Sequence, residues 1–105
     1  MALALKHANL NPRKLLIDGK WVDAQSGKTF RPINPATAEP LCEVAQADAA
    51  DIDLAVKSAR KAFDEGPWPW TTPAHRAGVL VRMAEILESR SAELRELIVA
   101  ETKFD

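Results

Sequence analysis

The sequence predicts an α+β fold in which a β-hairpin and further extended segments precede two to three α-helices. An Asp18-Gly19 pair stands between two short apolar runs, which is a strong hairpin signal. Beyond residue 48 the apolar residues change from alternation to the i, i+3, i+4 spacing of an amphipathic helix. Asp48 and Thr72 each precede such a stretch, where a side-chain oxygen can cap a helix.

The extended part is expected over residues 16–22 and 28–33. A type I′ turn needs positive φ at both central positions, and Asp and Gly tolerate it, so the chain should reverse at Asp18-Gly19. A third extended run ends at Val44 and contains Cys42, the only cysteine, which rules out an internal disulfide. A catalytic thiol needs a helix start, a cation or a base beside it. We therefore interpret Cys42 as a half-buried strand residue that packs as a small hydrophobe.

The first helix is predicted over residues 49–64. Asp48 can act as the N-cap, and Asp51 is favourable in the first turn because the helix dipole is positive there. Gly66, followed by Pro67, should end the helix in the left-handed conformation. The apolar face is predicted to contain Ile52, Ala55, Val56, Ala59, Ala62 and Phe63.

Residues 67–70 read Pro-Trp-Pro-Trp, which predicts a stiff loop without regular secondary structure. The favoured interpretation is that one tryptophan fills a gap between helices. A binding patch for carbohydrate or for a proline-rich peptide is the alternative.

The second helical region is predicted over residues 73–101, with Thr72 as N-cap and Pro73 at the first helical position. Ser91 could begin a third helix, or one bent helix could run through. His75 has no metal-binding neighbour at suitable spacing and is interpreted as a surface residue. The apolar stripe is predicted to contain Val79, Leu80, Met83, Ile86 and Leu87.

Composition limits the function classes. A chain of 105 residues forms at most one small domain of marginal stability. A net charge of −1 is not the strongly basic charge that attracts nucleic acid. No apolar run is long enough to span a membrane. We expect residues 1–14 to be a flexible lead and the chain to be cytoplasmic. The lead has three basic residues and no acid, which leaves organelle targeting as an alternative.

The order of several short motifs resembles the amino-terminal segment of the NAD(P)-dependent aldehyde dehydrogenase superfamily. The resemblance covers about residues 15 to 102 and rests on residues 17–21 (Ile-Asp-Gly-Lys-Trp), 26–30 (Ser-Gly-Lys-Thr-Phe), 34–37 (Asn-Pro-Ala-Thr), 53–56 (Asp-Leu-Ala-Val) and 59–63 (Ala-Arg-Lys-Ala-Phe), together with Trp68, Arg76, Leu80 and Leu94. It implies that residues 15–105 are part of a Rossmann-like cofactor-binding domain, that two helices meet near Ser91, that Trp68 packs and that Arg76 forms a structural ion pair.

The same resemblance implies that the catalytic apparatus lies in later sequence. The family's Gly-x-Thr-x-x-Gly cofactor segment, its Glu-Leu-Gly-Gly-Lys general base and its Gly-Gln-x-Cys nucleophile have no counterpart in these residues. We therefore assign no catalytic, cofactor-binding or metal-binding residue, and we expect NAD(P) to be bound by the family and not by this chain alone. Relatives continue after Glu101-Thr102 with glycine and lysine, whereas this chain has Lys103-Phe104-Asp105, which suggests truncation, a frameshift or gene decay near residue 103.

Three functions of different classes follow. The favoured one is a truncated amino-terminal part of an aldehyde dehydrogenase. Enzymes of this family oxidise aldehydes to carboxylic acids with NAD(P)+, and we expect this chain alone to be catalytically inactive. The alternative is a non-catalytic interaction module that binds a full-length relative or itself. An independent small enzyme lacks any recognisable catalytic constellation. We expect partners to be the remaining dehydrogenase polypeptide or a second copy, and the best-ordered contacts to join the two helical regions.

Overall fold

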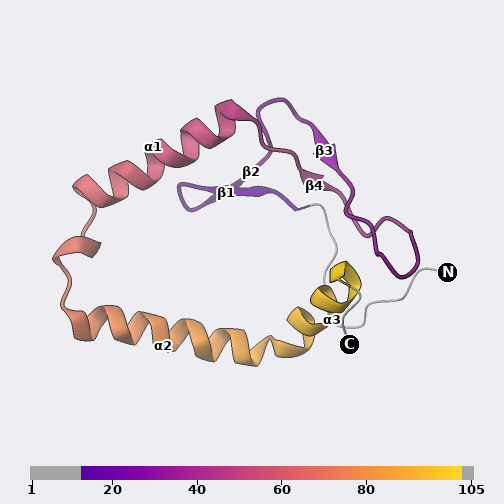
Figure 1. The fold of residues 1–105 in the computed structure, drawn as a ribbon. Coiled ribbons are helices and arrows are strands. Elements are labelled where there is room, and N and C mark those ends of the chain that lie inside the picture. The colour runs from indigo at the N-terminus through magenta and orange to yellow at the C-terminus, as the bar shows by residue number, and fades with distance from the viewer. Residues whose placement is uncertain (1–12, 103–105) are drawn as a thin grey trace.

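Two small antiparallel ladders are followed by helices that curve round into an open ring (Figure 1). The structure, a computed structural model, describes residues 13–102. The strands are β1 (Leu15–Ile17), β2 (Lys20–Val22), β3 (Thr29–Phe30) and β4 (Val44–Ala45). The helices are α1 (Ala49–Glu65), the 3-10 turn η1 (Trp68–Trp70), α2 (Pro73–Ser89) and α3 (Ser91–Thr102). This order confirms the predicted α+β fold. The predicted flexible lead falls mostly on residues 1–12, outside the described residues.

The first hairpin turns where the sequence predicted. Asp18 and Gly19 have φ values of 54° and 70°, as a type I′ turn requires. Strands β1 and β2 pair antiparallel, with Leu16 opposite Trp21 and Leu15 opposite Val22. Alternate side chains of a strand point to opposite faces, so Leu16 and Trp21 share one face of the hairpin and Leu15 and Val22 the other.

The second ladder is shorter than the predicted extended segments. β3 covers only two residues of the predicted range 28–33, and β4 begins at Val44. The placement of Cys42 in a strand is therefore wrong, because it lies in the segment before β4, although it is half-buried as expected. Between the strands, the buried Asn34 accepts a hydrogen bond from the backbone N–H of Ala36 at 2.9 Å, which folds the connection into a tight Asx turn.

Helix α1 matches the predicted range 49–64 to within one residue, but its end differs from the prediction. Gly66 has φ −78° and ψ 164°, which is extended backbone and not the left-handed cap. Its N–H nevertheless donates to the Ala62 carbonyl at 3.0 Å. A Cβ at position 66 would lie 2.3 Å from that same oxygen, so glycine is needed for close approach and not for positive φ.

The prediction of an irregular loop at residues 67–70 is also wrong, because Trp68–Trp70 form one turn of 3-10 helix. Prolines fit this turn because their fixed φ is close to the helical value. Trp68 contacts the ring of His75 edge-on, with centroids 6.2 Å apart. Trp70 is 87 % exposed, so the described part of the chain does not use it to fill a gap between helices.

Helices α2 and α3 are separate, which confirms the expected junction near Ser91. The Thr72 hydroxyl accepts from the His75 N–H at 3.1 Å, confirming the predicted cap. Arg76 donates to the carbonyl and the hydroxyl oxygen of Thr71, so its contacts within residues 13–102 are hydrogen bonds and not the expected ion pair. At the junction, the Arg90 N–H donates to the carbonyls of Ile86 and Leu87, which closes α2.

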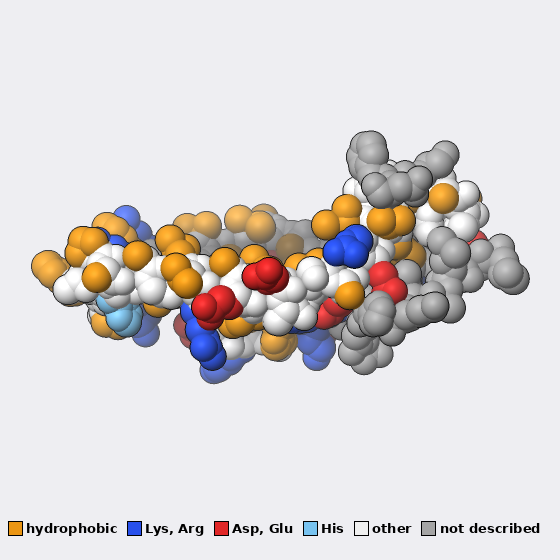
Figure 2. Space-filling view, turned by 90° about the horizontal axis from the view of Figure 1, so that it is seen from below, with side chains coloured by type: hydrophobic (Ala, Val, Ile, Leu, Met, Phe, Trp, Pro, Cys, Tyr) orange, Lys and Arg blue, Asp and Glu red, His pale blue; other side chains and the backbone are white. Residues whose placement is uncertain are grey.

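The chain forms one layer. Its principal extents are 51 × 35 × 18 Å, and the slab-like profile is visible in Figure 2. The radius of gyration is 17.2 Å, whereas about 13 Å is usual for a compact domain of this length. Helix α1 contacts β1 and η1, and α2 contacts α3. The expected packing between the two helical regions is therefore wrong: α1 and α2 lie on opposite sides of the ring (Figure 1).

Candidate functional site

Cys42 lies beside apolar residues and an exposed ion pair. Cys42 lies in a shallow depression of about 210 Å³ whose other lining residues are Arg31, Pro40, Leu41 and Glu43. The Arg31 guanidinium donates to Glu43 Oε1 at 3.2 Å, so the nearby cation is engaged in an exposed ion pair. Over residues 13–102, no cluster of three His, Cys, Asp or Glu side chains could hold a metal ion.

A larger cleft of about 460 Å³ separates the β1–β2 hairpin from helix α1. Ile17, Val22 and Leu54 contribute apolar side chains to it. Polar residues at its border hold the two elements together: the Ser58 hydroxyl approaches Asp18 Oδ1 at 3.5 Å. This cleft shows which face of the hairpin covers α1, namely the face that carries Ile17 and Val22.

Asp51 joins α1 to the segment that follows the hairpin. Its Oδ2 accepts from the Asp48 N–H at 3.1 Å and its Oδ1 from the Gln25 N–H at 2.9 Å, 26 residues away. Asp48 in turn accepts from the Ala50 N–H at 3.2 Å, completing a capping box. Asp51 is 2 % exposed. The two backbone donors, Asp48 first, stabilise the carboxylate and lower the pKa of Asp51 below its ordinary value of 3.8.

A pH dependence follows from this carboxylate. Because the pKa of Asp51 is lower in the folded chain than in the unfolded one, its stabilising effect is present above the ordinary pKa and is lost as the pH falls through the folded pKa. We expect the helix content of the chain, followed by circular dichroism, to fall below about pH 4. Asp51→Asn should be less helical at neutral pH and should lose much of that acid transition. Its single amide oxygen cannot replace both carboxylate oxygens.

Asp53→Asn is the matched control. Asp53 is on the same helix, but it is exposed, and among the described residues its ion pair is the one with Lys57 at 2.9 Å, an i,i+4 contact of small energetic weight. Identical acid transitions in the Asp51 and Asp53 variants would contradict the role assigned to Asp51.

The face of the hairpin that carries Leu16 and Trp21 is exposed. Leu16 and Trp21 are 59 % and 69 % exposed, on the face opposite to Ile17 and Val22. The hairpin lies inside the ring, next to α1 (Figure 1). Leu16 and Trp21 therefore point away from α1, towards the ring interior.

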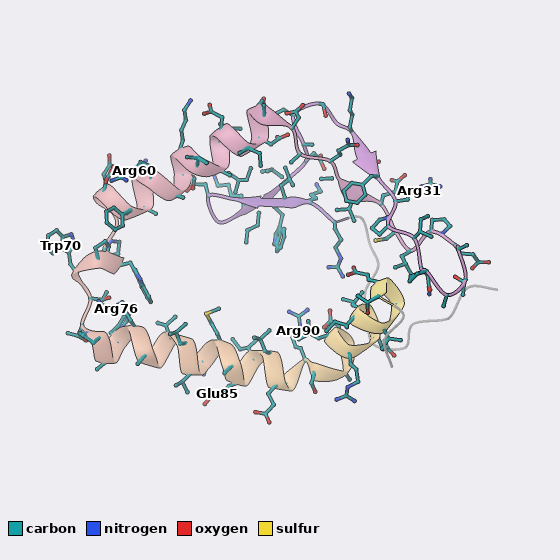
Figure 3. All side chains as sticks on the ribbon, in the orientation of Figure 1. Arg31, Arg60, Trp70, Arg76, Glu85 and Arg90 are labelled. Carbon is teal, nitrogen blue, oxygen red and sulfur yellow. The ribbon has the colours of Figure 1, made fainter. Side chains whose placement is uncertain are left out.

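Helix α2 presents an apolar stripe to the same interior. Figure 3 shows Arg76, in the first turn of α2, and Arg90, directly after its last residue, on the side that faces the ring interior, and Glu85 on the outer side. Leu80, Met83 and Leu87 follow Arg76 by 4, 7 and 11 residues, so they share its side of the helix. All three are exposed. We call Leu16, Trp21, Leu80, Met83 and Leu87 the inner face.

The outer sides of the ring carry charged side chains. On α1, Arg60 points away from the ring interior (Figure 3), donates to Asp64 and lies 5.2 Å from the Phe63 ring centroid. Figure 2, seen from the α2 side, shows acidic and basic side chains among hydrophobic ones. The predicted apolar face of α1 is likewise uncovered, since Ile52, Val56 and Phe63 are all more than half exposed.

The ring closes where α3 approaches the first described residues. Arg90 donates two hydrogen bonds of 2.9 Å to Glu93, one to each carboxylate oxygen. Chiefly through these bonds, and with a smaller electrostatic contribution from Arg13, the pKa of Glu93 lies below its ordinary value. Glu93 therefore lies near Arg90, which directly precedes α3, and near Arg13, the first described residue.

Comparison with known proteins shows the family to which this chain belongs. The family model of the aldehyde dehydrogenase family matches residues 21–103. The chain therefore belongs to the aldehyde dehydrogenase family. It resembles the amino-terminal segment of the family's members, as the motifs predicted.

Individual relatives agree with this assignment. The chain is 51 % identical over 84 residues to aldehyde dehydrogenase family 2 member B4, mitochondrial, of Arabidopsis thaliana, covering 80 % of this chain and 16 % of that protein. It is 49 % identical over 83 residues to the aminoacetaldehyde dehydrogenase of Pseudomonas aeruginosa, covering 79 % and 17 %. The chain thus spans about a sixth of the length of these relatives.

Solved structures share the fold. The Mycobacterium tuberculosis aldehyde dehydrogenase complexed with NAD+ superposes with a TM-score of 0.84 at 40 % identity, covering 90 % of this chain and 20 % of that one. An NAD-dependent aldehyde dehydrogenase from Sinorhizobium meliloti gives 0.82 at 37 % identity, covering 86 % and 18 %. Within the described residues, no helix is both long and apolar enough to cross a membrane.

Proposed function

We propose that this chain forms the amino-terminal layer of the cofactor-binding domain of an aldehyde dehydrogenase, an oxidoreductase that converts an aldehyde to a carboxylic acid with NAD(P)+. The chain supplies structure and no catalytic group, and it is catalytically incompetent alone. The observation that carries the proposal is a single layer, 18 Å thick, with uncovered apolar faces, whose arrangement matches part of complete dehydrogenases.

Domains bury apolar surface between two or three layers, so one layer needs a second. The chain exposes 8401 Å², whereas about 5,800 Å² is usual for a folded protein of this mass. Within residues 13–102 the buried hydrophobic residues are three alanines: Ala24, Ala45 and Ala100. Large apolar side chains are therefore left exposed. In our proposal, the remaining polypeptide of a dehydrogenase forms the second layer that buries them.

The starts of α1 and α2 argue against dinucleotide binding by the described residues. Pyrophosphate is commonly bound at a helix N-terminus where backbone N–H groups are free. At the start of α1 those donors are taken by Asp48 and Asp51, whose negative charges would repel a phosphate. At the start of α2 the Thr72 hydroxyl takes one donor and Pro73 lacks another. In our proposal the remaining polypeptide binds NAD(P), and no chemical step is assigned to this chain. We propose a cytoplasmic location on the same compositional grounds as above.

A chimaeric enzyme tests the proposal. The matching segment of the Pseudomonas aeruginosa aminoacetaldehyde dehydrogenase is replaced by residues 15–102 of this chain, and aldehyde oxidation is measured. We expect a soluble enzyme whose rate is within about tenfold of the parent, equivalent to about 1.4 kcal/mol in the barrier. The same enzyme with a shuffled segment of identical composition is the control and should be insoluble. A chimaera as inactive as this control would overturn the proposal.

A further inference from the structure

One side of helix α1 forms a wall of the cleft between this helix and the β1–β2 hairpin. Four of the lining residues follow one another at spacings of three, four and three residues, which places them on the same side of the helix: Asp51, Leu54, Ser58 and Lys61. The hairpin runs beside α1 and forms the opposite wall (Figure 1). The cleft therefore has an apolar residue of α1 in its middle and a lysine at one end.

The size and the apolar lining of the cleft suit a small molecule. Its volume of about 460 Å³ falls in the range of roughly 300–1,000 Å³ that is usual for ligand pockets. Leu54 faces Ile17 and Val22 across the cleft but is still 41 % exposed, so these side chains leave it partly uncovered. From Leu54 to Lys61 the helix rises about 10 Å. An apolar body of about this length can contact both walls.

The acidic side chains of the cleft already have partners. Asp51 accepts backbone N–H groups through both carboxylate oxygens. The Asp23 carboxylate lies 3.6 Å from the ammonium of Lys14. Asp18 faces the Ser58 hydroxyl at 3.5 Å. A cationic ligand would therefore have to compete with a neighbour at each of these three carboxylates.

The two lysines that line the cleft differ in this respect. Lys57 lies 2.9 Å from the Asp53 carboxylate. Among the described residues, no hydrogen bond or ion pair engages the Lys61 ammonium. A lysine side chain can lay its apolar stem along an apolar surface and present three N–H donors beyond it. Lys61 therefore offers a positive charge to a ligand that lies against Leu54.

We propose that this cleft binds a small amphiphilic carboxylate, whose apolar body lies between the hairpin and α1 and whose carboxylate accepts hydrogen bonds from the Lys61 ammonium. The site lies outside the proposed function, because it takes no part in aldehyde oxidation. Its occupant bridges two elements that are otherwise joined mainly at their borders.

The test measures binding of octanoate to the 105-residue chain by isothermal titration calorimetry. Hexanoate and decanoate complete a length series, and we expect roughly three- to fourfold tighter binding for each added methylene. Octylamine and octanol have the same chain length but a different head group. We expect both to bind at least about tenfold more weakly than octanoate. Unspecific apolar binding would instead favour octanol, which has no charge to desolvate.

Lys61→Met and Lys20→Met form a matched pair of variants. Methionine keeps an unbranched apolar stem and removes the charge. Lys20 belongs to β2 of the same hairpin, is exposed and is not part of the cleft lining. We expect Lys61→Met to weaken octanoate binding at least about tenfold and to remove the preference for octanoate over octanol. Lys20→Met should change the affinity by about twofold or less.

Circular dichroism and sedimentation of each variant check that helix content and association state are unchanged, so that unfolding does not imitate lost binding. Absence of octanoate binding would overturn the proposal, and tighter binding of octylamine would show a site for cations instead. Equal binding of all three head groups, or equal effects of the two variants, would show unspecific apolar binding and would also overturn it. Because binding is measured on the chain itself, an inactive chimaera would overturn the proposed function and not this site.

Discussion

The 105-residue chain on its own is expected to bind a hydrophobic dye and to sediment as a mixture whose average mass rises with concentration. Among its exposed side chains are Leu80, Leu87 and Phe63, at 62 %, 54 % and 64 %. Each such side chain left in water forgoes about 1.5–3 kcal/mol relative to full burial. Self-association or a molten state recovers part of that energy.

Three measurements check this expectation: sedimentation velocity over a dilution series, dye fluorescence, and thermal melting at each concentration. The chimaeric dehydrogenase is the control, because the same residues would be covered there and dye binding should be small. A monodisperse monomer with a sharp cooperative melt and no dye binding would contradict the expectation. It would mean that the described layer is stable as a domain in its own right.

Local signals in the sequence predicted the elements well, because they act over a few residues. The hairpin turn depends on Asp18 and Gly19 alone, and the starts of α1 and α2 depend on the side chains of Asp48 and Thr72. Each of these features is decided by the conformational preference or hydrogen bonding of one or two residues. The surrounding fold does not need to be known.

The features that the sequence predicted wrongly, or did not predict, depend on neighbours distant in sequence or on fine backbone geometry. The bond between Asp51 and Gln25 joins residues 26 positions apart, and no spacing rule contains it. Gly66 was correctly expected at the helix end, but the close approach of the Ala62 carbonyl, not positive φ, requires it. Cys42 falls outside β4 because only two residues of that run pair with β3.

The sequence predicted which α2 residues belong to the inner face, but not which part of the chain that face points towards. The period of α2 identifies Leu80, Met83 and Leu87 as one stripe, which the structure confirms as exposed. Nothing in that period says that the stripe faces the hairpin. That relation depends on how η1 and the α2–α3 junction turn the chain, which the pattern of apolar residues does not encode.

The purified chain is expected to give no NAD(P)+-dependent oxidation of an aldehyde above the protein-free blank. Attack by a thiolate on an aldehyde requires an activated thiol and donors for the developing oxyanion, and those donors are typically worth about 3–4 kcal/mol. Around Cys42 the described residues are Pro40, Leu41 and an ion pair between Arg31 and Glu43. None of these residues is placed both to deprotonate the Cys42 thiol and to donate a hydrogen bond to the developing oxyanion.

The assay follows reduced nicotinamide formation with aliphatic and aromatic aldehydes, and NAD+ and NADP+ are tested separately. Cys42→Ala supplies the decisive comparison in two settings. In the isolated chain, oxidation that disappears with this substitution would show that Cys42 is a nucleophile and would overturn the structural assignment. In the chimaera, the same substitution should change the rate by about twofold or less, because a half-buried thiol in a loop contributes only packing. A large loss in the chimaera with unchanged solubility would place Cys42 in the reaction after all.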